Sequence, residues 1–277
     1  ATAPPGLIQI EAGLQSFCET TLEAVDRKTD LTVLTENLRQ CIRPHNVHVH
    51  IDLIAGLPYE DYKTFAASFN SAFALRPHML QLGFLKLLYG SALREEAEAN
   101  ACRFSPDPPY EVLSTRWLSY EDLCQLKDVE QAIERLYNSG KFQRTLAWAL
   151  PRTGLTPYAF YLAMGRRMGE SPGKLSHERL TELLYAYLTQ AGLPGEQLRD
   201  CLVWDRLATD NTGYLPPLLQ RDPAGVKAAA RRYREQHPEA RRAHFALVED
   251  GATLLAADWE ETHPVTRLGQ VQTLKNP

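Results

Sequence analysis

Hydrophobic and polar residues alternate along the first two of three short segments in the first ninety residues. Between Leu7 and Gln15, one face is apolar, and the other carries Leu7, Gln9, Glu11, Gly13 and Gln15. Between Val47 and Leu53, aliphatic side chains face one way, and His48, His50 and Asp52 face the other. A period of two residues is typical of β-strands. We therefore expect strands here and a third over Met79 to Leu88.

Helical periodicity fills the gaps between these strands. Leucines and isoleucines spaced three or four residues apart run from Leu31 to Arg43, and Pro44 ends the pattern. Helices are also predicted for Thr20 to Lys28, Tyr59 to Leu75 and Ser91 to Ala101. Strands that alternate with helices pair in parallel through right-handed crossovers. The first hundred residues therefore predict an α/β unit.

The polar strand faces favour a barrel over an open sheet. Parallel strands covered by helices on both faces read as unbroken apolar runs, whereas these strands keep one polar face. In a β/α barrel that face points into a functional interior. Three strands cannot close a barrel, and a strand follows Ala1 to Gly6 almost at once. We therefore expect the chain to be a fragment whose other strands lie upstream.

A second domain is predicted after a proline-rich stretch, Phe104 to Tyr110. We place the half barrel in residues 1–103 and a mostly helical domain in residues 104–277. Pro151, Gly173 and Gly192 are its expected breaks. Its expected helices are Glu121 to Asn138, Gln143 to Ala149, Pro157 to Met168, Ser176 to Ala191, Pro194 to Ala208 and Pro223 to Gln236. Apolar runs from Ala243 and from Thr253 flank Glu249-Asp-Gly251 and predict a terminal β-hairpin.

Charge and composition exclude several classes. Thirty basic and thirty-four acidic residues give a net charge of -4, which argues against a nucleic-acid partner. Basic residues on the predicted helix Pro223 to Gln236 are expected to form a solvated face, with a phosphate or nucleic-acid contact as the alternative. No apolar run is long enough to cross a membrane, so no membrane partner and a cytoplasmic location are expected. Five scattered cysteines fit neither a disulfide framework nor a zinc site.

Three motifs follow one another in the first domain. They are Gly13-Leu-Gln-Ser-Phe17, Val25-Asp-Arg-Lys28 and His50-Ile-Asp-Leu-Ile-Ala-Gly-Leu-Pro58. Together they resemble the central part of the radical S-adenosylmethionine (SAM) barrel. With Tyr110 to Tyr120 downstream, the chain is most similar to the cobalamin-binding-domain branch of that superfamily. The resemblance implies the second half of a TIM-type radical SAM barrel, followed by an α-rich C-terminal domain without assigned chemistry.

The residues themselves allow plausible roles at a barrel site. Gln15 and Asp52 lie near the C-terminal ends of neighbouring strands, where barrel active sites form, and both can bond a ribose diol. Arg27 suits bidentate capture of a carboxylate, and Glu11 can take an ammonium or orient Arg27. Each has an ordinary alternative, since a strand glutamine is commonly a satisfied polar residue and Arg27 alone would suit a helix surface.

The resemblance assigns these residues to SAM. It implies that Gln15, with the adjoining Ser16, and Asp52 hold the ribose, and that Arg27 contacts the methionyl carboxylate. Ile54 and Gly56, with the backbone of residues 84–86, would frame the adenine, where a glycine allows close backbone approach. His48 and His50 share the face of Asp52, and we expect them to pack and hydrogen-bond there, with metal binding as the alternative.

The chain departs from the family in one respect: it contains no Cys-x3-Cys-x2-Cys motif for a 4Fe-4S cluster. The cluster loop and any cobalamin domain are expected upstream of Ala1. The expected function is that of a radical SAM enzyme fragment, inactive alone, acting on an unknown or small-molecule substrate with flavodoxin or ferredoxin as reductant. The alternatives are a tRNA-modifying radical SAM enzyme and a degenerate barrel that serves as a non-catalytic scaffold.

Overall fold

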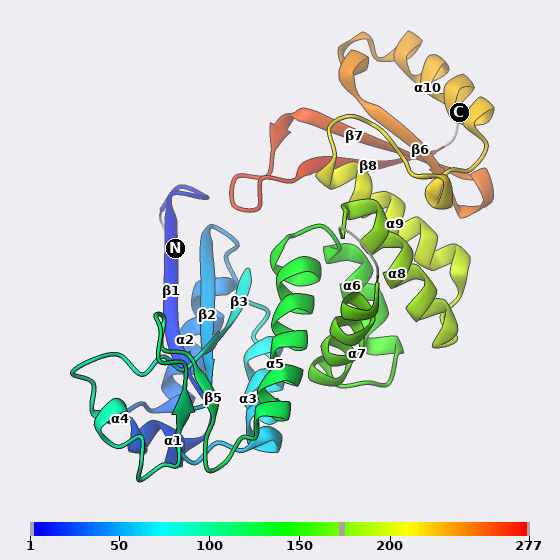
Figure 1. Ribbon diagram of the computed structural model, residues 1–277. Coiled ribbons are helices and arrows are strands. Elements are labelled where there is room, and N and C mark those ends of the chain that lie inside the picture. Colours follow the sequence, from blue (N-terminus) through cyan, green and yellow to red (C-terminus); the bar gives the residue numbers. More distant parts are fainter. Residues whose placement is uncertain (1–2, 172–174, 276–277) are drawn as a thin grey trace. The chain divides into compact units, whose positions relative to one another are not determined.

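The computed structural model describes residues 3–171 and 175–275, and Gly173, an expected helix break, lies outside them (Figure 1). The chain divides into two compact units. The first contains Ala1–Asn138 and Thr156–Glu170, and the second contains Ser139–Leu155 and Ser171–Pro277. Residues of each unit contact mainly other residues of the same unit. The domain boundary after residue 103 stays a prediction.

A parallel three-stranded sheet forms the centre of the first unit, as the alternating pattern predicts. The strands are β1 (Ile8–Gln15), β2 (Val47–Ala55) and β3 (Met79–Phe84), in the order β1-β2-β3. Every second residue of β2, from Val47 to Ala55, is buried, and the residues between them are only half-buried. The sheet therefore has one core face and one polar face, and the prediction of three parallel strands is confirmed.

Helices α1 (Glu19–Ala24), α2 (Leu31–Ile42) and α3 (Tyr62–Ala74) connect these strands. The Asp30 side chain accepts from the backbone N–H of Val33 at 3.0 Å and so caps α2. Phe65, Phe69 and Phe73 lie along one side of α3 and are fully or almost fully buried. Helix α1 is shorter than the predicted Thr20 to Lys28, because the chain turns at Asp26, which has a φ of 54°.

No closed barrel forms among the strands of the described residues. The first unit holds the parallel sheet and a separate two-stranded sheet of β4 (Arg103–Phe104) and β5 (Val112–Ser114). The partial barrel is therefore not confirmed, and the coarser α/β class with a parallel sheet is what the structure shows. Helix α4 (Ala92–Glu95) covers only part of the helix predicted for Ser91 to Ala101.

The rest of the first unit is helical. Helix α5 (Tyr120–Ile133) begins with a capping box between Ser119 and Asp122 and continues as a π-helical turn over Glu134–Asn138. Helix α7 (Pro157–Glu170) packs against α5 so closely that a Cβ on Gly165 would lie 2.0 Å from the carbonyl oxygen of Asp128. Glycine at this position therefore allows the two helices to meet.

The second unit combines helices with an antiparallel sheet. The longer elements are α6 (Gln143–Ala149), α8 (His177–Gln190), α9 (Gly195–Thr209), α10 (Pro223–Gln236), β6 (His244–Val248), β7 (Thr253–Thr262) and β8 (Gly269–Lys275). Short 3-10 turns occupy Leu150–Arg152, Pro217–Leu219, Pro238–Arg242 and Glu249–Gly251.

The sheet of the second unit has the order β6-β7-β8, so the predicted hairpin is confirmed and is extended by a third strand. Strand β8 has no apolar alternation strong enough to be predicted, because its sequence, Gly-Gln-Val-Gln-Thr-Leu-Lys, is mostly polar. Ala229 and Ala230 of α10 pack with Phe245 and Leu247 of β6 in one buried cluster. Helix α10 therefore covers one face of this sheet.

Candidate functional site on the polar face of the parallel sheet

The polar face of the first sheet is organised in rows across the strands. Glu11 pairs in register with His50, which pairs with Met79, and Asp52 pairs with Gln81. Gly13 follows Ala12, the register partner of Ile51, so its missing side chain falls on the same face as Asp52. The polar residues that the sequence places on β1 and β2 therefore share one surface.

Strand β1 ends in a sharp turn at Gln15. Its φ is 71°, and the N–H of Ser16 donates to the carbonyl of Leu14 at 3.0 Å, which closes a three-residue γ-turn. This turn is uncommon and strained for a residue with a side chain. A Cβ on Gly13 would lie 2.7 Å from the Gln15 Nε2. The turn thus brings the Gln15 carboxamide back over Gly13, onto the polar face.

Arg27 reaches the same point from the end of α1. The N–H of Arg27 donates to the carbonyl of Leu22 at 2.8 Å, and the N–H of Asp26 donates to the carbonyl of Glu23 at 3.1 Å. These two hydrogen bonds form the pattern of a Schellman C-cap. The Arg27 Nη1 then donates to the carbonyl of Gly13 at 2.7 Å. The longer predicted helix would have contained Arg27, but in the structure Arg27 lies beyond the end of α1. Its guanidinium lies beside Gly13.

Asp52 is the central titratable group of the polar face. Burial raises the pKa of its carboxyl to about 6, and the neighbouring Glu11 carboxyl adds to the shift through its charge and a hydrogen bond. The Asp52 Oδ1 is buried and has no hydrogen-bond partner in the described part of the chain. A buried oxygen without a donor is costly, so this atom favours a ligand that supplies a hydroxyl.

Ser16 lies in the core and away from the polar face. It is fully buried, and its hydroxyl donates to the Glu60 Oε1 at 2.6 Å and accepts from the N–H of Cys18 at 2.9 Å. The Ser68 hydroxyl donates to the same Glu60 oxygen at 2.7 Å and accepts from the N–H of Phe17 at 3.1 Å. This network anchors the residues that follow the turn at Gln15, so Ser16 positions Gln15 in this structure.

Burial raises the pKa of the Glu60 carboxyl, and the hydrogen bonds from Ser16 and Ser68 only partly oppose that shift. Sequence reasoning missed Glu60 and Ser68. The only available signal was that Glu60 lies two residues after Pro58, the last residue of the third motif. Nothing in the pattern of α3 distinguishes Ser68 from the other small residues of that helix.

Ile54 and Gly56 lie at the end of β2. Ile54 is half-buried and shares the face of Asp52 by alternation. Gly56 is buried with a φ of 96°, and a Cβ there would meet Val112 of β5 at 2.8 Å. The space beside Gly56 is therefore filled by Val112, which gives this glycine a packing reason as well as a conformational one.

Histidines gather at the other end of the polar face. The ring of His48 lies 4.7 Å from that of His50 and 4.9 Å from that of His78, between ring centroids. Burial, and then the nearby His50, lowers the pKa of His48. Residues 3–171 and 175–275 contain no group of three or more histidine, cysteine or acidic side chains arranged to hold a metal ion. The sequence did not predict His78 as a member of this cluster.

The fold and this surface define a mixed α/β protein with one polar face on its parallel sheet. Residues 99–253 match the family described as "Protein of unknown function (DUF4080)", which covers more than half of the chain. The chain therefore belongs to this family. No curated protein matches it. Among the helices of the described residues, none has the length and apolar composition needed to cross a bilayer.

Proposed function

We propose that this chain forms the SAM-binding part of a radical SAM enzyme. The observation that carries the proposal is the convergence of the Gln15 carboxamide and the Arg27 guanidinium. Both lie within 4 Å of the position a Cβ would take on Gly13, on the face where Asp52 keeps an unpartnered oxygen. An amide, a permanent cation and a hydrogen-bond acceptor at one strand end suit a ligand with hydroxyls and a carboxylate.

SAM carries these groups as a ribose diol, a methionyl carboxylate and an ammonium. Asp52 would accept from a ribose hydroxyl, Arg27 would pair with the carboxylate, and Glu11, one row away on the same face, is suited to the ammonium. Bound beside a reduced 4Fe-4S cluster, SAM supplies a 5'-deoxyadenosyl radical. This chain has no Cys-x3-Cys-x2-Cys motif, so other cysteines would have to hold the cluster, and a flavodoxin or ferredoxin is the proposed electron donor.

The raised pKa of Asp52 makes this binding dependent on pH. A hydroxyl that donates to the carboxylate stabilises its ionised form, so SAM binding should lower a pKa of about 6 and release protons near that pH. SAM affinity should accordingly rise between pH 5 and pH 7. Calorimetric titrations in two buffers of different ionisation enthalpy measure the released protons directly.

The decisive experiment is a titration of SAM into the cluster-loaded enzyme that contains this chain. Arg27→Ala removes a charge-assisted contact of about 1.5 to 3 kcal/mol and should weaken SAM binding roughly ten- to hundred-fold. Asp52→Asn keeps the shape and one acceptor, and it should weaken binding less. Arg43→Ala, at an exposed position after α2, is the matched control.

Unchanged affinity in both site variants would show that these residues do not hold SAM. A cluster-loaded enzyme that binds no SAM at all would instead favour a non-catalytic scaffold. If the wild-type enzyme bound SAM only when tRNA was also bound, the result would favour the tRNA-modifying alternative.

A further inference from the structure

A pocket of about 320 Å³ lies within the second unit, beside β6. This volume is at the lower end of the range for small-molecule sites. Leu219, Phe245 and Leu247 of the pocket wall are buried, and Arg221 is the charged residue that lines it. The other lining residues come from the segment before α10, from the start of α10 and from β6.

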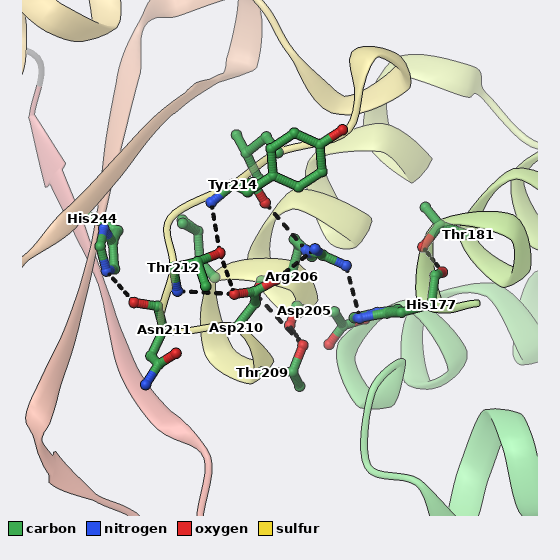
Figure 2. A network of polar contacts seen from close by, with 12 residues as sticks. His177, Thr181, Asp205, Arg206, Thr209, Asp210, Asn211, Thr212, Tyr214 and His244 are labelled. Carbon is green, nitrogen blue, oxygen red and sulfur yellow. Dashed lines mark hydrogen bonds and ion pairs between the residues drawn. The ribbon is translucent and has the colours of Figure 1, made fainter.

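Polar contacts hold the segment that forms one wall of this pocket (Figure 2). The Arg206 Nε donates to the carbonyl of Tyr214 at 3.2 Å, and the Arg206 guanidinium also forms an ion pair with Asp210 at 2.5 Å. The His244 Nε2 lies 2.7 Å from the carbonyl oxygen of Asn211 and connects the segment to β6. A Cβ on Gly213 would lie 2.3 Å from the His244 Nδ1. The wall is therefore fixed against the strand.

Strand β6 is an edge of its sheet, and alternate residues direct their backbone groups away from β7. The contacts identify these residues as the odd-numbered ones. The carbonyl of Ala243 accepts from the Arg234 Nη2 at 2.9 Å, and that of Leu247 accepts from the Arg199 Nη2 at 3.3 Å. Further along, the N–H of Glu249 donates to the Asp200 Oδ2 at 3.0 Å.

Phe245 is the odd-numbered residue between Ala243 and Leu247. No group in the described part of the chain outside the sheet bonds to its N–H or carbonyl. Phe245 is only 8% exposed and lines the pocket. The Arg199 guanidinium donates to the carbonyls of both Leu219 and Leu247, so the pocket residue Leu219 lies along the outer edge of β6, the side to which the N–H and carbonyl of Phe245 point. A buried backbone pair without partners is uncommon and calls for a ligand or an ordered water.

We propose that this pocket binds a small, mostly apolar molecule that carries an amide, such as a carboxamide or a lactam. An amide offers one carbonyl and one N–H side by side, which matches the N–H and carbonyl of Phe245. The apolar part of the molecule would occupy the space lined by Leu215, Leu219 and Val226. The arginine contacts at Ala243 and Leu247 block the next positions of the edge, so an added β-strand does not fit.

Benzamide is a suitable probe, because it has a carboxamide on a small apolar ring. Acetophenone is the matched control compound, because it keeps the ring and the carbonyl but has no N–H donors. The chain contains nine phenylalanines, so ¹⁵N-phenylalanine labelling gives a simple spectrum, and Phe245→Leu identifies the Phe245 signal. We expect benzamide to shift the Phe245 amide resonance with a dissociation constant on the order of 1 mM, typical of a very small ligand. Acetophenone should bind at least several-fold more weakly.

Val226→Trp enlarges a half-buried pocket side chain and should abolish the benzamide shift, while the matched control Lys227→Trp, exposed on the same helix, should keep it. The site is wrong if saturating benzamide leaves the Phe245 signal unmoved, or if Val226→Trp binds like Lys227→Trp. Equal binding of acetophenone and benzamide would refute the amide assignment. The wild-type titrations decide these points even if Val226→Trp does not fold.

Discussion

Asp205 of α9 caps a neighbouring helix from outside that helix. Helix α6 begins after Phe142, which offers no side-chain cap, and the Asp205 carboxyl oxygens accept from the N–H groups of Arg144 at 2.9 Å and Thr145 at 2.8 Å. Asp205 is only 4% exposed. The two hydrogen bonds and the helix N-terminus favour the ionised carboxyl, and burial opposes ionisation.

Burial is the larger effect, and it raises the pKa of Asp205 from 3.8 to about 6. Between these values the native state binds more protons than the unfolded state, so its stability falls as the pH rises. The contribution of the Asp205 carboxyl to the free energy of unfolding is complete below pH 3.8 and is lost as the pH passes through about 6. At about 1.4 kcal/mol for each pKa unit it amounts to about 3 kcal/mol. About 2 kcal/mol of this should fall between pH 4.5 and pH 7.5.

Asp205→Asn removes this titration and preserves the shape of the side chain. Urea unfolding at several pH values, followed by far-UV circular dichroism, should show that the stability of the wild type relative to Asp205→Asn falls by about 2 kcal/mol from pH 4.5 to pH 7.5. The comparison with the variant is needed because His177 acts in the opposite direction. Its pKa is lowered to about 4, mainly by burial, so its contribution rises with pH.

The control is Asp107→Asn, which changes an exposed aspartate and should leave the pH dependence unaltered. A difference between wild type and Asp205→Asn that stays constant with pH would show that Asp205 has an ordinary pKa. A difference that grows with pH would show that the two N–H bonds and the helix terminus outweigh burial. Either result would refute the reasoning.

Two further predictions concern packing in the first unit. Ser68→Ala leaves the N–H of Phe17 without its acceptor and should lower the free energy of unfolding, measured in urea, by about 1 to 3 kcal/mol. The control Ser71→Ala, at an exposed position of the same helix, should change it by less than about 0.5 kcal/mol. Gly165→Ala forces α5 and α7 apart and should lower the midpoint of thermal unfolding, while Gly169→Ala, with no atom within 4 Å of its new Cβ, should leave it unchanged or raise it. Equal effects within either pair would contradict the contacts described.

The sequence by itself determined the elements whose pattern is local. The strand spans around Val47 and Met79 follow from apolar alternation or apolar runs, and the bounds of α6 and α10 agree with the predicted ones, because helical periodicity and a proline start are read within a few residues. The polar faces of β1 and β2 were also predictable, since alternate residues of a strand must lie on opposite sides.

Only the tertiary structure decided how that polar face is built. The Schellman turn at Asp26 takes Arg27 out of its helix, and the γ-turn at Gln15 is held by Ser16 through Glu60, 44 residues further on. The packing of Val112 against Gly56 is likewise a contact between distant segments. Such contacts leave no periodic trace, because they depend on which strands become neighbours and on which buried groups find partners. For the same reason, the three strand patterns correctly predicted a parallel sheet, whereas the partial barrel that they also favoured is not confirmed.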